Sequence, residues 1–230
     1  MTAQLALRAL PSSPAAAVGA RTAWMAGQAA CEPLRTAGTV IHVAQGREIF
    51  AEGGDTDVFY KVVSGVVRAC KFLSDGRRQI EAFHVAGVLF GLELGEERAM
   101  SAEAVTDCTL ISYRRHSIQT LAQKDQTVSH QLFQYAMQNL AQAQSHSLLL
   151  GRRGAAEKVA AFLLDWAKHS DGGRMLHLAM TRQDIADYLG LTIETVSRSL
   201  TQFERDGVIA LPGARQVKIL NTDVLEDLAA

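Results

Sequence analysis

The segment LTIETVSRSL, residues 191–200, places a carboxylate and a guanidinium four residues apart among apolar positions. On a helix this spacing puts Glu194 and Arg198 on one face, where an ion pair would contribute roughly 0.3–0.5 kcal/mol. The same side chains also suit the edges of base pairs, since an arginine can donate two hydrogen bonds to guanine and a carboxylate can accept one from cytosine. The segment alone fits both interpretations, so the elements that position it must decide.

Capping residues around this segment predict two short helices joined by a tight turn. Thr181 is a good N-cap with Asp184 three residues on, and Gly190 suits the left-handed conformation that ends a helix. Thr192 then caps a second helix. Helices joined by so short a turn must cross steeply, which is the helix-turn-helix arrangement. The following segment, DGVIALPGARQVKIL, reads as strand, turn and strand, and predicts a wing behind the second helix.

The second helix is expected to divide into an apolar inner face and a polar outer face. Its inward positions are Ile193, Val196, Leu200 and Phe203, and its outward positions are Glu194, Thr195, Ser197, Arg198 and Thr201. In the major groove of DNA, Glu194, Thr195 and Arg198 would meet base edges. Phosphate contacts are expected at the helix starts and in the wing, from Thr181, Arg182, Thr192, Ser197 and Arg215.

Upstream, residues 39–113 alternate β-rich runs with turn clusters. A spacing of roughly ten residues between turns favours an antiparallel roll or barrel. The run Ser74-Asp75-Gly76-Arg77 indicates a hairpin, because Asp and Gly tolerate positive φ. Residues 1–38, rich in Ala, Ser and Pro, are expected to form a flexible arm with a short helix around TAWMAGQAACEPL.

Residues 126–150 switch to a helical period with a narrow apolar stripe. A helix packed on its own domain would show this pattern, but the near absence of charge between Ser129 and Leu150 favours a helix packed along a copy of itself. A homodimer is therefore expected. The predicted dimerisation residues are Val128, Leu132, Ala136, Leu140 and Ala143.

These features predict an α+β chain with four parts. They are the arm (1–38), an antiparallel β-roll (39–125), the dimerisation helix (126–150) and a C-terminal winged helix-turn-helix (151–230). The segment GRRG, residues 151–154, is a natural hinge before the last part.

Composition excludes several classes of protein. The chain has 230 residues, of which 48% are hydrophobic and 20% charged, and no apolar run approaches a membrane span. Its three cysteines include no C-x-x-C pair, so we expect a cytoplasmic protein without a disulfide framework or a cysteine-based metal site. Cys70 and Cys108 are expected to pack between strands, whereas Cys31 on the arm is the candidate for oxidation. The net charge of −1 decides nothing, since residues 151–220 carry ten Lys/Arg against eight Asp/Glu, which makes +2.

The segment TRQDIADYLGLTIETVSRSLTQFERDGVI resembles the winged helix-turn-helix of the CRP/FNR superfamily of bacterial transcription regulators. Likewise, EIFAEGGDTDVFYKVVSGVVR resembles that superfamily's cyclic-nucleotide-binding β-roll, and the likeness spans roughly residues 35–225. Glu194, Ser197 and Arg198 match the Glu-x-x-Ser-Arg pattern of the FNR and FixK branches. The resemblance implies recognition of TTGA…TCAA palindromes, with Ile193 and Thr195 as further base neighbours.

Departures from the family pattern bear on the effector. Members that respond to cyclic AMP carry an Arg-Ser pair for the cyclic phosphate, but here Met100 precedes Ser101, with Arg98 two residues away. The arm also lacks the cysteine cluster of the oxygen-sensing FNR branch. The chain is therefore most similar to the FixK branch, whose members generally activate genes of microoxic respiration and nitrogen metabolism without a known effector.

The resemblance thus implies an activator with DNA and RNA polymerase as partners, no cofactor and no enzymatic activity. The alternative is a ligand-gated regulator with a small molecule in the β-roll. His84 could bind haem in such a sensor, although a strand histidine is usually structural. A third possibility, a cupin-type metal enzyme, lacks the clustered His/Glu motif that it would need.

Overall fold

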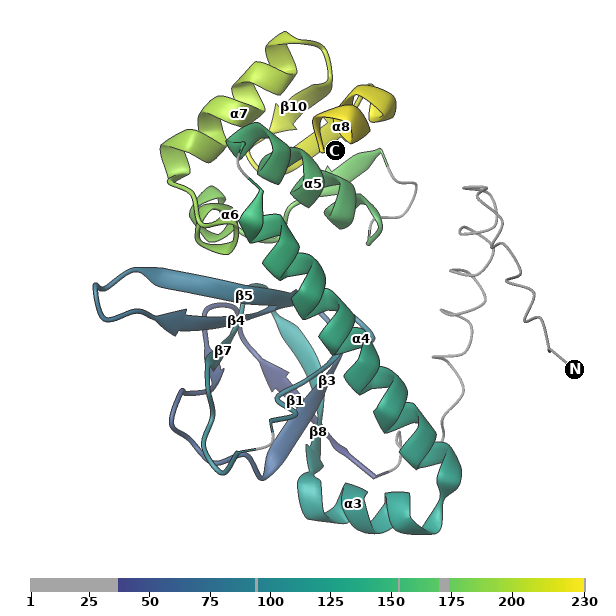
Figure 1. Ribbon diagram of the computed structural model, residues 1–230. Coiled ribbons are helices and arrows are strands. Elements are labelled where there is room, and N and C mark those ends of the chain that lie inside the picture. Colours follow the sequence, from purple (N-terminus) through teal and green to yellow (C-terminus); the bar gives the residue numbers. More distant parts are fainter. Residues whose placement is uncertain (1–36, 94, 153, 170–173, 230) are drawn as a thin grey trace, which may run out of the picture.

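The computed structural model describes residues 37–93, 95–152, 154–169 and 174–229 (Figure 1). The helix expected around TAWMAGQAACEPL and the thiol of Cys31 lie outside the described residues. Within the described ranges, no helix is both long enough and apolar enough to cross a membrane.

The N-terminal part is a β-roll made of two antiparallel four-stranded sheets, with strand orders β1-β8-β3-β6 and β2-β7-β4-β5. Its interior is apolar, with Val62, Phe90, Ala102 and Leu110 all at most 2% exposed. Cys70 and Cys108 are also buried, which confirms them as packing thiols. The strands are β1 (Thr39–Val43), β2 (Glu48–Phe50), β3 (Val58–Ser64), β4 (Val67–Phe72), β5 (Arg78–His84), β6 (Leu89–Phe90), β7 (Ser101–Ala104) and β8 (Cys108–Arg114).

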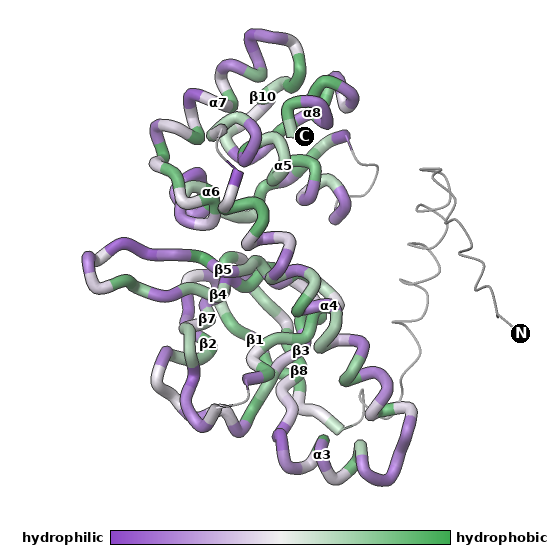
Figure 2. The backbone as a smooth tube through the Cα atoms, viewed as in Figure 1, coloured by the Kyte–Doolittle hydropathy of each residue, from purple (hydrophilic) through white to green (hydrophobic). Residues whose placement is uncertain are grey.

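The predicted hairpin joins β4 to β5. Gly76 adopts a φ of 83° in its turn, and Asp75 accepts hydrogen bonds from the backbone N–H and the Nε of Arg77 at 3.0 and 2.7 Å. The turn itself is hydrophilic, but the exposed apolar side chains of Phe72 and Leu73 directly precede it (Figure 2). The hairpin reaches beyond the rest of the roll to lie beside the C-terminal part of the molecule (Figure 1).

Two helices follow the roll, α3 (Arg115–Lys124) and the long α4 (Gln126–Gly151), which runs from the roll to the C-terminal part (Figure 1). One face of α4 packs on its own protomer. Val128 is fully buried beside Phe59 and Tyr113, and Leu132 packs against the same cluster.

This packing corrects part of the predicted dimerisation stripe. Val128 and Leu132 face their own protomer, because the apolar periodicity of α4 serves the roll at that end of the helix. Ala136, Leu140 and Ala143 are exposed. The large apolar side chains that α4 leaves exposed are Phe133 (61%), Met137 (45%), Leu140 (50%) and Leu148 (76%).

The C-terminal part is the predicted winged helix-turn-helix, so the predicted α+β fold is confirmed. The apolar faces of its helices meet in one core, which includes Leu163, Ile185, Leu200 and Ile219. Its elements are α5 (Ala155–Ala167), β9 (Met175–His177), α6 (Arg182–Leu189), α7 (Ile193–Arg205), β10 (Ile209–Gly213), β11 (Gln216–Ile219) and α8 (Thr222–Leu228).

The cores of the two parts are continuous. Ile80 and Phe83 of β5 belong to the same buried cluster as Ile185 and Ala186 of α6. Tyr188 of α6 packs against Phe83 at 5.3 Å between ring centroids. The base of the β4–β5 hairpin is therefore an integral part of the surface on which α6 rests.

Replacing Gly190 tests whether the turn between α6 and α7 requires a residue with left-handed backbone conformation. Its φ of 63° is left-handed, so Gly190→Ala should cost about 1–2 kcal/mol in the free energy of unfolding. Gly151→Ala is the matched control, because that glycine has open space around its Cα and lies in α4. Urea unfolding should show the loss for Gly190→Ala and none for Gly151→Ala, where alanine favours the helix. Equal stability of the two variants would contradict the role of the turn.

Candidate nucleic-acid interface

The helix α7 is fixed from its inner side. Val196, Leu200 and Phe203 are at most 3% exposed, as predicted, and pack into the C-terminal core. At its start the Thr192 hydroxyl accepts a hydrogen bond from the backbone N–H of Thr195 at 3.3 Å, which confirms the predicted cap. Burial and capping together hold the first turns of α7 in a defined position while their outer face stays free.

That outer face carries the predicted base-reading residues. Glu194 and Arg198 are exposed, Thr195 and Ser197 are partly exposed, and an open, shallow depression is lined by Ile193, Glu194, Ser197 and Arg198. The apolar pattern predicts Ile193 on the inner face, but its side chain is 37% exposed. The helix start turns its first residue past the edge of the core, so Ile193 joins the outer face.

Glu194 and Arg198 do not form the surface ion pair that their spacing allows. Among the ion pairs of the described residues theirs is absent, and the Nε of Arg198 instead donates to the backbone carbonyl of Glu194 at 3.4 Å. The pKa of the Glu194 carboxyl lies below its usual value because it accepts its own backbone N–H and the Thr192 hydroxyl, with a smaller contribution from Arg198. Both side chains are thus charged and exposed, and they form no direct ion pair with each other.

The predicted phosphate-contacting residues lie at the starts of the two helices and on the wing. Arg215 is exposed between β10 and β11 and makes a long 3.4 Å hydrogen bond to the carbonyl of Ala179. Arg182 is partly exposed in the first turn of α6. Thr181 is less free than expected, since its hydroxyl donates to Asp184 at 2.8 Å while accepting from the Asp184 N–H at 3.1 Å.

The sequence gives no indication of a group of ion pairs that joins α6 to the β-roll. Asp184 and Asp187 form ion pairs with Arg68 and Arg78 of the hairpin. More than a hundred residues separate the partners along the chain, so no local pattern indicates the contact.

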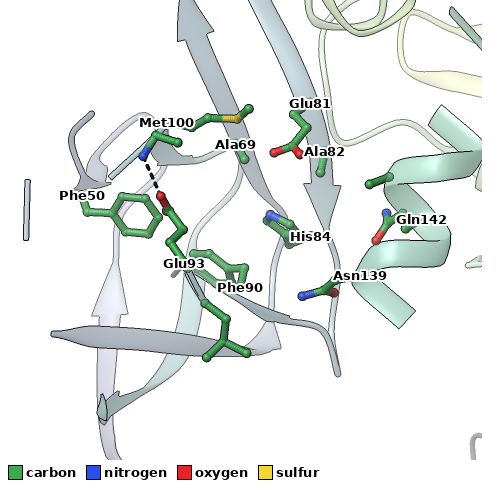
Figure 3. Close-up of a pocket in the computed structure, with 14 residues that line it drawn as sticks. Phe50, Ala69, Glu81, Ala82, His84, Phe90, Glu93, Met100, Asn139 and Gln142 are labelled. Carbon is green, nitrogen blue, oxygen red and sulfur yellow. Dashed lines mark hydrogen bonds between the residues drawn. The ribbon is translucent and has the colours of Figure 1, made fainter. Parts of the chain in front are cut away.

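A second candidate site is a cavity of about 260 Å³ between the β-roll and α4 (Figure 3). Glu81, His84 and Phe90 line it from the roll, opposite Asn139 and Gln142 of α4. Its remaining lining residues are Phe50, Ala69, Ala82, Gly91, Leu92, Glu93, Ala99, Met100 and Ala143.

The charges of this cavity disfavour an anionic ligand. Glu81 and Glu93 both line it, and the pKa of Glu81 is raised by burial and further by Glu93. Arg98 is the nearest cation in sequence to the position of the missing phosphate-binding arginine, and both of its terminal nitrogens are engaged. Its Nη1 donates to the Gly91 carbonyl at 2.7 Å and lies 3.7 Å from Glu93, and its Nη2 donates to the Val58 carbonyl, while its Nε is buried without a hydrogen-bond partner among the described residues. Its guanidinium also lies 4.1 Å from the centroid of the Phe50 ring.

His84 serves the packing of this cavity. Its ring stacks on Phe90 at 5.0 Å, and its Nδ1 is buried without a hydrogen-bond partner among the described residues. Burial lowers the pKa of His84 to about 4. Within the described residues no group of three or more His, Cys, Asp or Glu is arranged to hold a metal ion.

The depressed pKa of His84 predicts acid sensitivity. An unfolded histidine takes up its proton near pH 6.5 but the native ring only near pH 4, so the native state loses stability as the pH falls from about 6.5. Because the residue is partly exposed, we expect a loss of about 1–2 kcal/mol between pH 7 and pH 5. Urea unfolding of the His84→Leu variant should show a smaller drop than the unaltered protein. An identical drop in both would place the acid sensitivity elsewhere.

Comparison with known proteins identifies the two parts. Residues 40–125 match the cyclic nucleotide-binding domain, and residues 157–228 match the Crp-like helix-turn-helix domain. The nitrogen fixation regulation protein FixK of Rhizobium meliloti is 45% identical over 183 residues, covering 80% of this chain and 83% of that protein. FixK of Azorhizobium caulinodans is 46% identical over 213 residues, covering 88% and 86%.

Among solved structures, FixK2 from Bradyrhizobium japonicum superposes with a TM-score of 0.80 at 42% identity, covering 84% of this chain and 98% of that one. These relatives are regulators and not enzymes, in agreement with the prediction from sequence. The two domains, the order in which they occur and the identity to FixK together show that this chain belongs to the CRP/FNR family of transcription regulators, in its FixK-type branch.

Proposed function

We propose that the protein is a dimeric regulator that reads TTGA…TCAA-type palindromes without a required small-molecule effector. The observation that carries the proposal is the outer face of α7, where Glu194 and Arg198 stand exposed, charged and unpaired with each other on a helix fixed by capping and burial. A helix held in this way can enter the major groove without reorganising its side chains against the protein.

In this proposal Arg198 donates two hydrogen bonds to a guanine, and Glu194 accepts from the paired cytosine or a neighbouring base. Ile193 and Thr195 offer methyl groups to thymines on either side. The helix N-termini hold phosphates together with Arg182 and Arg215, which sets the register of α7 in the groove.

Dimerisation would use the exposed apolar stripe of α4. Phe133, Met137, Leu140 and Leu148 recur at spacings of four, three and eight residues, so they lie along one side of the helix, opposite Val128 and Tyr135. Four large apolar side chains in one stripe are more than a solvated helix needs, and a second α4 offers the complementary surface. Such a dimer would present two α7 helices to successive major grooves, about 34 Å apart.

Independence from an effector is supported by the cavity of the β-roll. A cyclic nucleotide carries a negative phosphate, whereas the cavity presents Glu81 and Glu93, and Arg98 is held by backbone carbonyls. Placing the phosphate there would require breaking the Arg98 hydrogen bonds in a poorly solvated site, which is costly.

The competing function is a regulator that binds DNA only when a small molecule occupies the β-roll. The cavity itself favours it, since about 260 Å³ next to the unpartnered Nδ1 of His84 would accept a small neutral or cationic molecule. The two functions differ in whether the protein alone binds its palindrome.

The relatives named as nitrogen fixation regulators support a role in nitrogen metabolism or microoxic respiration. In that role the protein would act in the cytoplasm and recruit RNA polymerase as an activator.

The base-reading role of Arg198 predicts a specific loss. Arg198→Ala should remove about 1–3 kcal/mol of discrimination between TTGA half-sites and half-sites altered at the guanine. Arg215→Ala is the control for a phosphate contact, and should weaken all duplexes alike and lower the salt-dependence slope by about 0.9. Fluorescence anisotropy across salt concentrations measures both. Undiminished discrimination by Arg198→Ala would remove that residue from base recognition.

The proposed dimer interface on α4 predicts that a charge introduced there separates the protomers. Leu140→Glu would bury a carboxylate in the stripe, so sedimentation equilibrium should report monomers at micromolar concentration, where the unaltered protein is dimeric. Ser117→Glu introduces the same charge at an exposed position of α3, outside the stripe, and should leave the dimer intact. If Leu140→Glu remained dimeric, another surface would have to join the protomers.

A further inference from the structure

Asp184 of α6 is the centre of a buried charge cluster. Its side chain is 3% exposed, and its Oδ2 accepts hydrogen bonds from the Thr181 N–H at 2.9 Å and from the Thr181 hydroxyl at 2.8 Å. Its Oδ1 accepts from Arg68 Nη1 at 3.0 Å and from Arg78 Nη2 at 2.5 Å. One carboxylate thus completes the N-cap of a helix in one domain and receives two guanidinium groups from another.

The cluster extends on both sides of Asp184. Arg78 also donates from its Nε to Asp187 at 2.7 Å, and Arg68 donates from its Nε to Glu103 of β7 at 2.9 Å. The arginine side chains are each 18% exposed, and Asp187 is 11% exposed. Two cations therefore lie between three carboxylates in a poorly solvated layer, where removing a cation leaves unpaired buried charge.

The charged residues of the cluster come from two different domains. Arg68 and Arg78 lie on the β4–β5 hairpin, whereas Asp184 and Asp187 lie on the first helix of the helix-turn-helix. The hairpin strands β4 and β5 lie next to α6 (Figure 1), and the ion pairs join these elements. Apolar contacts such as Phe83 on Tyr188 allow sliding, but multiple charge-assisted hydrogen bonds fix one orientation.

That orientation passes directly to α7. The Leu191 N–H donates to the Ala186 carbonyl at 2.9 Å across the turn at Gly190, and the inner faces of α6 and α7 share one core. Helices α6 and α7 therefore move as a unit, and whatever holds α6 also aims α7.

We propose that Arg68 and Arg78 are positioning residues for DNA recognition, which lock α6 to the β-roll through Asp184 and Asp187 so that the two α7 helices of a dimer match both half-sites of a palindrome. The inference rests on the proposed function, which it deepens by naming what sets the reading geometry in the absence of an effector. Neither arginine touches DNA. Loss of the lock spreads the orientations of the reading helix, and only a fraction of dimers can then engage both half-sites at once.

The test compares two adjacent arginines. Arg78→Glu replaces the locking cation with an anion. Arg77→Glu makes the same change at a side chain that is 77% exposed and that, among the described residues, forms an ion pair only with Asp75 in its own turn. Binding of the full-length variants is measured by fluorescence anisotropy on three duplexes: a TTGA…TCAA palindrome, a duplex with one half-site and a scrambled duplex.

We expect Arg78→Glu to weaken binding to the palindrome about tenfold or more relative to Arg77→Glu, while the two variants bind the single half-site equally. Adding Asp187→Arg to Arg78→Glu returns a cation to the cluster and should recover part of the loss. Equal preference for the palindrome in the two single variants would overturn the proposal, as would tighter palindrome binding by Arg78→Glu or no recovery in the double variant.

Hydrogen exchange of the same proteins separates this proposal from the proposed function. Arg78→Glu should speed amide exchange in β5 and α6 and leave α7 protected. Arg77→Glu should leave amide exchange in β5, α6 and α7 unchanged. If the unaltered protein does not distinguish the palindrome from the scrambled duplex, the proposed function fails. Hydrogen exchange would still test whether Arg78 holds α6 to the β-roll. Unchanged protection of β5 and α6 in Arg78→Glu would overturn the lock even if DNA recognition stands.

Discussion

The structure depends on how one buried carboxylate is satisfied. Burial of Asp184 opposes its ionisation, but hydrogen bonds from Thr181 and the charges of Arg68 and Arg78 outweigh that effect and hold its pKa below the usual value. An ionised group at 3% exposure persists only with such donors around it. Since the donors come from two domains, the need to satisfy Asp184 ties the start of α6 to the β-roll.

Because of this constraint, one side of the C-terminal domain is packed against the β-roll and the opposite side is exposed. The inner surface of α6 is occupied by the hairpin and the shared core, and His146 of α4 adds a stacked contact on Tyr188 at 4.1 Å. The outer face of α7 carries Glu194 and Arg198, which have no such contacts with another helix or strand of the described residues. In the proposed account the β-roll holds α6 and, through α6, sets the orientation of α7, in addition to forming the cavity that it shares with α4.

Local features of the C-terminal domain could be predicted from the sequence because they depend on neighbouring residues. The cap at Thr181, the left-handed Gly190 and the inward Val196 follow from backbone sterics and helical periodicity, and the structure confirms each. Periodicity shows which side of a helix is apolar but not what covers it. For that reason the periodicity predicts a partner contact for Val128, which packs on its own protomer, and gives no indication of the exposed Phe133.

The charge cluster lies beyond this kind of inference. Arg68 and Asp184 have unremarkable neighbours in sequence, and only the folded arrangement of hairpin and helix brings them to 3.0 Å. Ile193 illustrates a smaller limit, because at the first residue of a helix the apolar stripe no longer indicates burial.

The most direct measurement for the central claim is a titration of the purified protein, with no added ligand, against a TTGA…TCAA duplex and a duplex altered in both half-sites at physiological salt. If the reading helix is aimed by the protein's own contacts, the ligand-free protein binds the palindrome at nanomolar concentration, with an affinity about a thousandfold or more above that for the altered duplex. Equal, weak binding to both duplexes that becomes selective only after a small molecule is added would contradict it, and would make the β-roll cavity the site of control.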